Sequence, residues 1–200
     1  MRTTPAPTRR TLLSGLALSA FALAGCTTAE DAAQPSSVPT PADLLTAHGL
    51  EGRSAQEIID QLEALPLAER PTDLLAAVLP DQLSLSDAAG REASLPLSAG
   101  QSYVSVAPFV ESTHECFHHS LTTCLGELQD QDVQVLLTTI DGDVLRDEVR
   151  TTAPNGFLGL WLPRDQQLTL TLTHDGASAA TPLATDEESP TCITTMQLGA

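Results

Sequence analysis

From about residue 82 to the C-terminus, apolar and polar residues alternate in short runs, and this period limits the possible folds more than any other feature. Seven runs rich in Thr, Val and Leu are predicted to be strands: "LSLSD", "SYVSVAPFV", "DVQVLLTTI", "DVLRDEVRT", "GFLGLWL", "LTLTLTH" and "TCITTMQL". Turn signals such as "DGD", "PNG" and "HDG" separate them. Short strands joined by hairpin turns predict an antiparallel β-sandwich or a partly open barrel over residues 82–200.

Residues 42–81 carry helical signals instead. One helix is predicted over "PADLLTAHGL", and a second over "SAQEIIDQLEALP", where Ser54 and Glu57 form a capping box. A third helix is predicted over Thr72–Leu79. We expect these helices to form a compact layer that serves as scaffold or as a dimer interface. The chain is therefore predicted to be α+β, with a short N-terminal helical region followed by a β-rich domain.

The first 26 residues, "MRTTPAPTRRTLLSGLALSAFALAGC", have a basic start and an apolar run too short to span a bilayer comfortably, and they predict an export signal. The ending "LAGC" resembles the bacterial lipobox, which implies that Cys26 is lipidated and anchors an extracytoplasmic protein to the membrane. "TRRTLL" also resembles the twin-arginine signature, so the general and the twin-arginine export routes both stay open. Residues 27–41, "TTAEDAAQPSSVPTP", are predicted to be a flexible tether.

The charge of the chain excludes several classes of function. Nine arginines face 26 acids, for a formal net charge of −17, and the sequence contains no lysine. Schiff-base lysine chemistry is therefore excluded. After cleavage before Cys26, six arginines against 26 acids would leave a net charge of −20. Such a surface repels nucleic acid and anionic lipid and attracts cations, so no nucleic-acid partner is expected.

The cysteines are odd in number once Cys26 is lipidated. Cys116, Cys124 and Cys192 remain, and three thiols cannot all pair within one chain. A thiol that stays free outside the cytoplasm is buried and inert, bonded to another chain, metal-bound or redox-active. The stretch "HECFHHSLTTCLGEL" also places three of the five histidines beside two of these cysteines.

The spacing of Cys116 and Cys124 requires a reversal of the chain. Eight residues span about 12 Å in a helix and about 26 Å in a strand. A disulfide needs Cα atoms within roughly 7 Å, and thiolate ligands of one ion lie within about 4 Å of each other. If the two cysteines cooperate, the chain must turn back around residues 119–122. Cys192 would then reach them through the sheet, and Met196 on the same strand face is expected to be core.

Three thiolates without a bridging partner suit Cu(I), whereas Cu(II) prefers imidazole and oxygen ligands. Zinc also accepts three thiolates and a histidine. His114, His118 and His119 bracket Cys116, where they would capture Cu(II), lower a thiol pKa or complete the coordination shell. The alternative is that they are solvated loop residues. Of the three histidines, His118 is the one that we most expect to take part in the site.

Four segments together resemble the CueP family of periplasmic copper-binding proteins: "YVSVAPFV", "THECFHHSLTTCLGEL", "NGFLGLWLPRD" and "TCITTMQL". The resemblance places the functional cysteines of that family on Cys116, Cys124 and Cys192, and it decides for copper over zinc. It implies an envelope copper protein with a helical dimerisation region and a β-rich metal domain. It further implies reduction of Cu(II) and supply of copper to a superoxide dismutase or another cuproprotein.

The sequence thus predicts a lipid-anchored copper chaperone or sequestering protein rather than an enzyme. Forming one disulfide releases two electrons, enough for two Cu(II) ions, so any reduction would be stoichiometric unless an outside donor restored the thiols. Two other readings stay open. One is a thiol–disulfide redox protein, against which stands the absence of a CxxC motif. The other is a structural lipoprotein without a metal.

Overall fold

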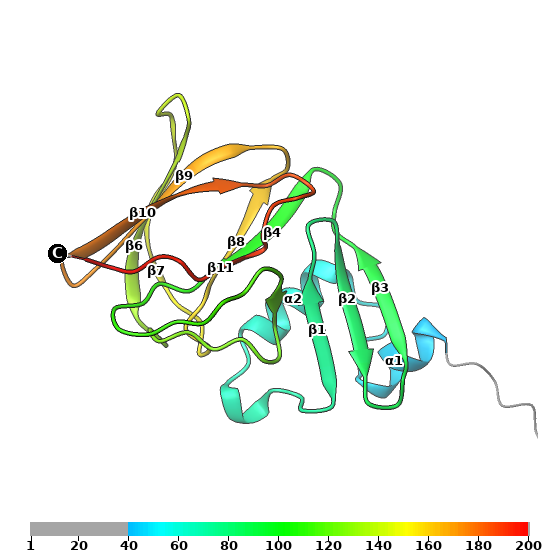
Figure 1. Cartoon of the computed structure of the whole chain (residues 1–200). Helices are drawn as coiled ribbons and strands as arrows, with labels where there is room; N and C mark the ends of the chain where they lie inside the picture. The colour runs from blue at the N-terminus through cyan, green and yellow to red at the C-terminus, as the bar shows by residue number, and fades with distance from the viewer. Residues whose placement is uncertain (1–39, 200) are drawn as a thin grey trace, which may run out of the picture. The chain divides into compact units, whose positions relative to one another are not determined.

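The computed structural model describes residues 40–199. The export signal, Cys26 and the tether up to residue 39 lie outside these residues. The helical elements are α1 (Pro41–Ala47), α2 (Ala55–Glu63) and the 3-10 turn η1 (Leu67–Glu69) (Figure 1). The strands are β1 (Leu74–Val78), β2 (Gln82–Asp87), β3 (Glu92–Pro96), β4 (Gln101–Val106), β5 (His119–Ser120), β6 (Asp132–Thr139), β7 (Val144–Thr151), β8 (Leu158–Pro163), β9 (Gln167–His174), β10 (Ala177–Ala184) and β11 (Cys192–Ile193). None of the helices described is long and apolar enough to cross a membrane.

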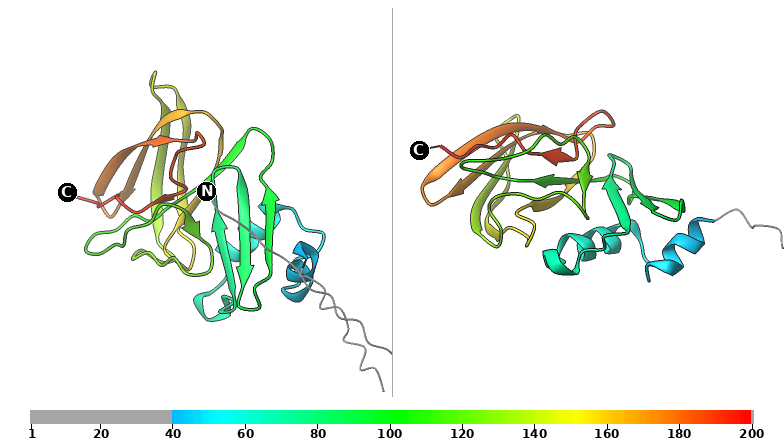
Figure 2. Two further views of the ribbon diagram at one scale, coloured as in Figure 1. Left: turned by 45° about the vertical axis from the view of Figure 1, so that its right-hand side comes forward. Right: turned by 60° about the horizontal axis from the view of Figure 1, so that its bottom comes forward.

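The first half of this region is a helix-covered sheet. Strands β3, β2, β1 and β5 pair in that order, all antiparallel, and both helices lie on one side of the sheet (Figure 2, right). Helix α2 begins at the predicted capping box, where the Glu57 amide donates to Ser54 Oγ (3.3 Å) and the Ser54 amide donates to the Glu57 carboxylate (2.8 Å). The core between helices and sheet is aliphatic and includes Leu44, Leu50, Ile58, Ile59, Leu62, Leu74, Val78, Leu83 and Leu85.

The third predicted helix is wrong, because Leu74–Val78 forms strand β1. Leu74, Ala76 and Val78 are buried, while Leu75 between them is 56% exposed, which is the period of a strand. A run this short cannot nucleate a helix on its own, whereas antiparallel pairing with β2 satisfies its backbone. Strands β3 and β10 were also not predicted, since "EASLP" and "ASAATPLA" contain few β-branched or aromatic residues.

The second half is a sandwich of two sheets. Strands β10, β9, β6 and β7 form one antiparallel sheet, and β11, β4 and β8 form the other. Both sheets direct alternate residues into a shared aliphatic core that includes Val104, Val106, Val133, Val135, Leu137, Leu158, Leu160, Leu162, Leu168, Leu170 and Leu172. The sheets pack face to face without closing into a barrel, so the predicted α+β fold with a β-sandwich is confirmed. The strand predicted over "TCITTMQL" is shorter than expected, because only Cys192–Ile193 forms a strand, which pairs in parallel with β4.

Strand β4 is buried on both faces and joins the two halves. Tyr103 packs in the helix-covered core, whereas Val104 packs in the sandwich core. Ser105 lies on the same strand face as Tyr103, and its Oγ donates a 2.8 Å hydrogen bond to Glu63 at the end of α2. The C-terminal end of α2 is therefore held beside the sandwich, where the cysteines lie.

Candidate metal centre

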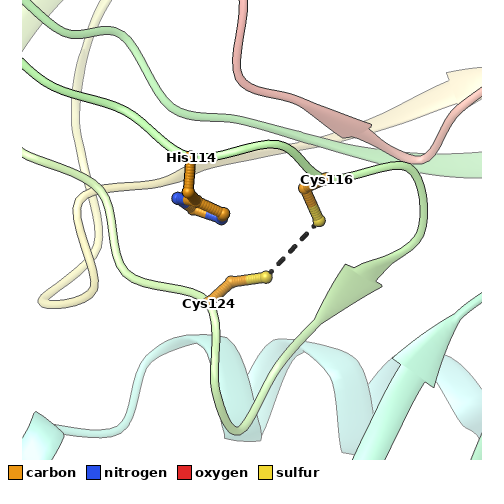
Figure 3. Close-up of side chains that lie close together, drawn as sticks. All are labelled: His114, Cys116 and Cys124. Atoms are coloured by element: carbon orange, nitrogen blue, oxygen red, sulfur yellow. Dashed lines mark hydrogen bonds between the residues drawn. The ribbon is translucent and has the colours of Figure 1, made fainter.

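The chain reverses between Cys116 and Cys124, as their spacing required. After the short strand β5, the amide of Cys124 donates to the carbonyl of Ser120 (3.1 Å), and the amide of Ser120 points to the Cys124 sulfur (3.4 Å). The Sγ atoms of Cys116 and Cys124 come within 3.6 Å of each other (Figure 3). This separation suits two thiolate ligands of one ion.

Strand β11 brings Cys192 to the same place. The amides of Thr191 and Cys192 donate to the carbonyl of Phe117 at 3.0 and 3.1 Å, and the amide of His119 donates to Thr191 Oγ1 at 3.0 Å. These bonds attach the segment around His119 to the start of β11. Cys116, Cys124 and Cys192 are all free thiols, and the three pack around Phe157 and Ala107 in a small apolar cluster.

Five donor residues form two overlapping groups. His114, Cys116 and Cys124 form one, and His119, Cys124 and Cys192 form the other; within each group, the donor atoms all lie within 4.8 Å of one another. Cys124 belongs to both. His114 faces the two sulfurs of the first group from the loop that precedes Cys116 (Figure 3).

His118 and Met196 lie apart from these groups. His118 is exposed, and its ring lies edge-on to Phe117 at 4.8 Å between centroids. Met196 is buried in the sandwich core, as expected. Of the three histidines singled out in the sequence, the structure therefore places His114 and His119 beside the cysteines and turns His118 to solvent.

A buried carboxylate fixes the orientation of His119. The ring of His119 has no exposed surface, its Nε2 donates to Glu63 Oε2 at 2.9 Å, and Ser105 Oγ donates to the other Glu63 oxygen. With Nε2 committed to Glu63, Nδ1 faces the sulfurs, 3.8 Å from Cys192 Sγ. The ring also packs on Phe157, with 4.5 Å between centroids. A carboxylate that orients a histidine is the usual support of a metal-binding imidazole.

The charges of the site favour one thiolate among the three sulfurs. Burial opposes the charged form of His119, but the charge of Glu63 outweighs it and raises the pKa of His119 to about 9. A hydrogen bond from Cys192, supported by His119, holds the pKa of Cys124 well below its usual range. Burial raises the pKa of Cys116, and the bond to Cys124 raises that of Cys192. Cys124 is therefore the sulfur that most readily carries the thiolate charge a metal ion needs.

The loop that carries His114 is held by another carboxylate. Glu127 accepts hydrogen bonds from the amides of Val110, Glu111 and Ser112 at 3.2, 3.0 and 2.9 Å. Its pKa is lowered chiefly by the bond from Ser112. Nε2 of His114 is buried and has no hydrogen-bond partner among the described residues. The imidazole is thus held in place with a ring nitrogen left free.

A close backbone contact seats Cys124 against the turn before β8. The amide of Gly126 donates to the carbonyl of Asn155 at 2.6 Å, and a Cβ on Gly126 would lie 2.6 Å from the carbonyl oxygen of Gly156. Only glycine permits this approach. Phe157, which follows Gly156, is fully buried and packs against the cysteines. The segments "CLG" and "NGF" therefore fit together because each contains a glycine.

Sequence reasoning missed Glu63, Phe157 and Glu127. A signal for Glu63 was present, because it lies four residues after Ile59 on the apolar side of α2, where an acid needs a partner. The role of Glu127 depends on a loop conformation that no local pattern encodes. The three thiol sulfurs are soft donors that fit Cu(I), and the adjacent imidazoles are donors that also suit Cu(II) and zinc.

A family model described as "Periplasmic copper-binding protein CueP" matches residues 57–197, which include all five donors. The chain belongs to the CueP family. The resemblance noted from the sequence is therefore confirmed. Membership of this periplasmic family implies an extracytoplasmic location and is consistent with copper ions as the partner.

A solved structure agrees with the family assignment. The crystal structure of S.CueP is similar to this chain with a TM-score of 0.72 and 35% sequence identity, and the match covers 78% of this chain and 95% of that one. No curated protein matches the chain.

Proposed function

We propose that this CueP-family protein sequesters or delivers copper as Cu(I), which it binds through Cys116, Cys124 and Cys192 with nitrogen donors from His114 and His119. One observation carries the proposal: three free thiols and two imidazoles, from segments up to 78 residues apart, converge around Cys124. Cu(I) prefers such soft donors. Because His118 is exposed and lies outside both donor groups, we assign it no ligand role.

The reduced protein also has the electrons to convert Cu(II) to Cu(I). Joining Cys116 to Cys124 would release two protons and two electrons, and each electron reduces one Cu(II) ion. These two sulfurs are 3.6 Å apart and need to close to about 2.05 Å to form the bond. The protein is then spent until an external thiol reductant restores it. We propose a stoichiometric reductant, with a copper-requiring enzyme such as superoxide dismutase as the recipient.

Attachment to the membrane is part of the proposal. The "LAGC" ending of the leader supports lipidation of Cys26. A Cys26→Ser variant should leave the membrane fraction while the copper affinity of its reduced form stays unchanged. A variant that remains in the membrane fraction would contradict the anchor but not the copper site.

The copper site is tested by competition with a chromogenic Cu(I) chelator. Cys124→Ser and Cys192→Ser should each weaken binding by about a hundredfold or more, because a hydroxyl is a hard donor. His118→Ala is the matched control and should bind as the unmodified chain does. Wild-type affinity in Cys192→Ser would contradict the three-cysteine site. Parallel titration with Zn²⁺ decides between the two metals.

The lowered pKa of Cys124 beside the Cys116 sulfur favours a second candidate, a thiol–disulfide redox protein. This candidate predicts that metal-free protein exchanges disulfides with a model substrate over many turnovers. Loss of thiols only in the presence of Cu(II), with about two ions reduced per chain, would support the copper function instead.

A further inference from the structure

The two donor groups around Cys124 differ in their access to solvent. We call His119, Cys124 and Cys192 the inner group and His114, Cys116 and Cys124 the outer group. In the inner group, His119 is 0% exposed and Cys192 is 2% exposed. His114 and Cys116, which complete the outer group, are only partly buried. An ion arriving from solvent therefore meets the outer pair first.

The outer pair borders open space. A hollow of about 460 Å³ is lined by His114, Cys116 and residues of the C-terminal segment. A second hollow of about 330 Å³ is lined by His114, Gly126 and Glu127 among other residues. His114 lines both hollows, and its Nε2 atom, which is itself buried, has no hydrogen-bond partner among the described residues.

The inner pair is fixed in place. Glu63 and Ser105 hold the His119 ring through a chain of two hydrogen bonds, and Phe157 packs against its face. Cys192 starts β11, where its amide is bonded to the carbonyl of Phe117. Fixed and dehydrated donors bind an ion tightly, because little order is lost when it arrives.

We propose that the cluster is two overlapping copper sites used in sequence: His114, Cys116 and Cys124 receive the ion, and His119, Cys124 and Cys192 retain it. This inference rests on the proposed function and adds an order of events to it. Cys124 stays bound during the transfer. The Cys192 thiol and Nδ1 of His119 each give up a proton as they bind, the departing Cys116 sulfur takes one up, and the other proton passes to solvent, so no oxidant or reductant is involved.

The proposal predicts that some variants change the rates of copper loading and release, whereas others change the copper affinity. A ligand that serves only the receiving site lies on the route both into and out of the retaining site. Its loss slows loading and release together and leaves the equilibrium constant nearly unchanged. Loss of a retaining ligand weakens binding instead, while the first capture of the ion proceeds at the normal rate.

The experiment compares variants of the full chain, reduced and kept free of oxygen. Stopped-flow mixing with Cu(I) held by a weak chelator gives the loading rate, and an excess of a strong chelator gives the release rate. We expect His114→Ala to slow both about tenfold with little change in affinity, and Cys192→Ser to lower affinity about a hundredfold with normal loading. His118→Ala, four residues further along the chain than His114 and exposed, should change neither.

X-ray absorption of the loaded protein supplies a second measurement. One nitrogen ligand should remain in His114→Ala, and the nitrogen signal should disappear only when His114 and His119 are both replaced by Ala, because His114 can still hold the ion at the receiving site in His119→Ala. Cys192→Ala replaces Cys192→Ser if the serine variant does not fold. The proposed order, in which the ion binds first at the receiving site and then at the retaining site, is contradicted if His114→Ala lowers the copper affinity as much as Cys192→Ser does. It is also contradicted if His114→Ala changes neither the loading rate nor the release rate. If the unmodified chain binds no Cu(I), the proposed function itself fails, which is a distinct result.

Discussion

At the scale of single residues, Glu63 is the least expected member of the site. It is an acid on the apolar side of a helix, and it stays charged because His119 lies 2.9 Å away and Ser105 donates to it. Burial works against its charge, but the charge of His119 keeps the pKa of Glu63 below its usual value. A charged residue buried this deeply is retained where it orients another group.

Glu63→Ala should weaken Cu(I) binding about tenfold or more, because His119 loses the carboxylate that directs Nδ1 to the sulfurs. Glu63→Gln keeps an oxygen that accepts from Nε2 and should recover most of the affinity. Chelator competition measures both variants, and Glu51→Gln at an exposed loop position is the control. If both Glu63 variants bind Cu(I) like the unmodified chain, then Glu63 serves folding alone.

At the scale of elements, the thiol-bearing loop is positioned with little regular structure. Between β4 and β6 only the two-residue strand β5 pairs with a sheet. The loop is held by the three amides bound to Glu127, by the contact of Gly126 with Gly156, and by backbone hydrogen bonds of Phe109 and Phe117 to the C-terminal segment. A side chain at this contact would move Cys124 away from the other sulfurs.

Gly156→Ala should destabilise the fold by about 3 kcal/mol, since it adds a backbone clash to the cost of a left-handed conformation. Its Cβ would lie 2.6 Å from the carbonyl carbon of Gly126. Gly90→Ala is a matched control, because Gly90 has φ +75° against +79° for Gly156 but nothing within 4 Å of an added Cβ. The control should cost only about 1 kcal/mol. If urea unfolding gives the same loss in free energy of unfolding for Gly156→Ala and Gly90→Ala, the close contact between Gly126 and Gly156 is not essential.

At the scale of the whole described region, the metal centre lies between two aliphatic cores. Glu63 comes from the helix-covered half, whereas Cys192 comes from the strand that joins the sandwich. Strand β4 contributes to both cores, and the cluster around Phe157 lies at their boundary. A bound ion would therefore link segments that belong to different halves.

Loading with Cu(I) should raise stability towards thermal or urea unfolding, by about 4 kcal/mol when free copper is a thousand times the dissociation constant. Unfolding is measured on reduced protein with and without the ion. Ag(I), a soft ion that does not change oxidation state, should act in the same way. Cys192→Ser removes the link to β11 and should lose most of the gain. A full gain in this variant would show that the ion binds without joining the two halves.

The sequence by itself determined helices α1 and α2 and most of the sandwich strands, though not β10, and it showed that three thiols remain besides Cys26. Alternation and capping are local, so they can be read without knowing the neighbours in space. The reversal before Cys124 also followed from the sequence, because no extended or helical segment of eight residues brings its ends together.

Only the tertiary structure decided which histidines face the sulfurs. His118 and His119 are neighbours in the sequence, yet the pairing of β5 with β1 turns one to solvent and the other to Glu63, 56 residues earlier in the chain. It also decided that Leu74–Val78 is a strand, since β2 supplies the backbone partners. Side-chain direction and distant partners depend on packing, and a local sequence pattern carries no information about either.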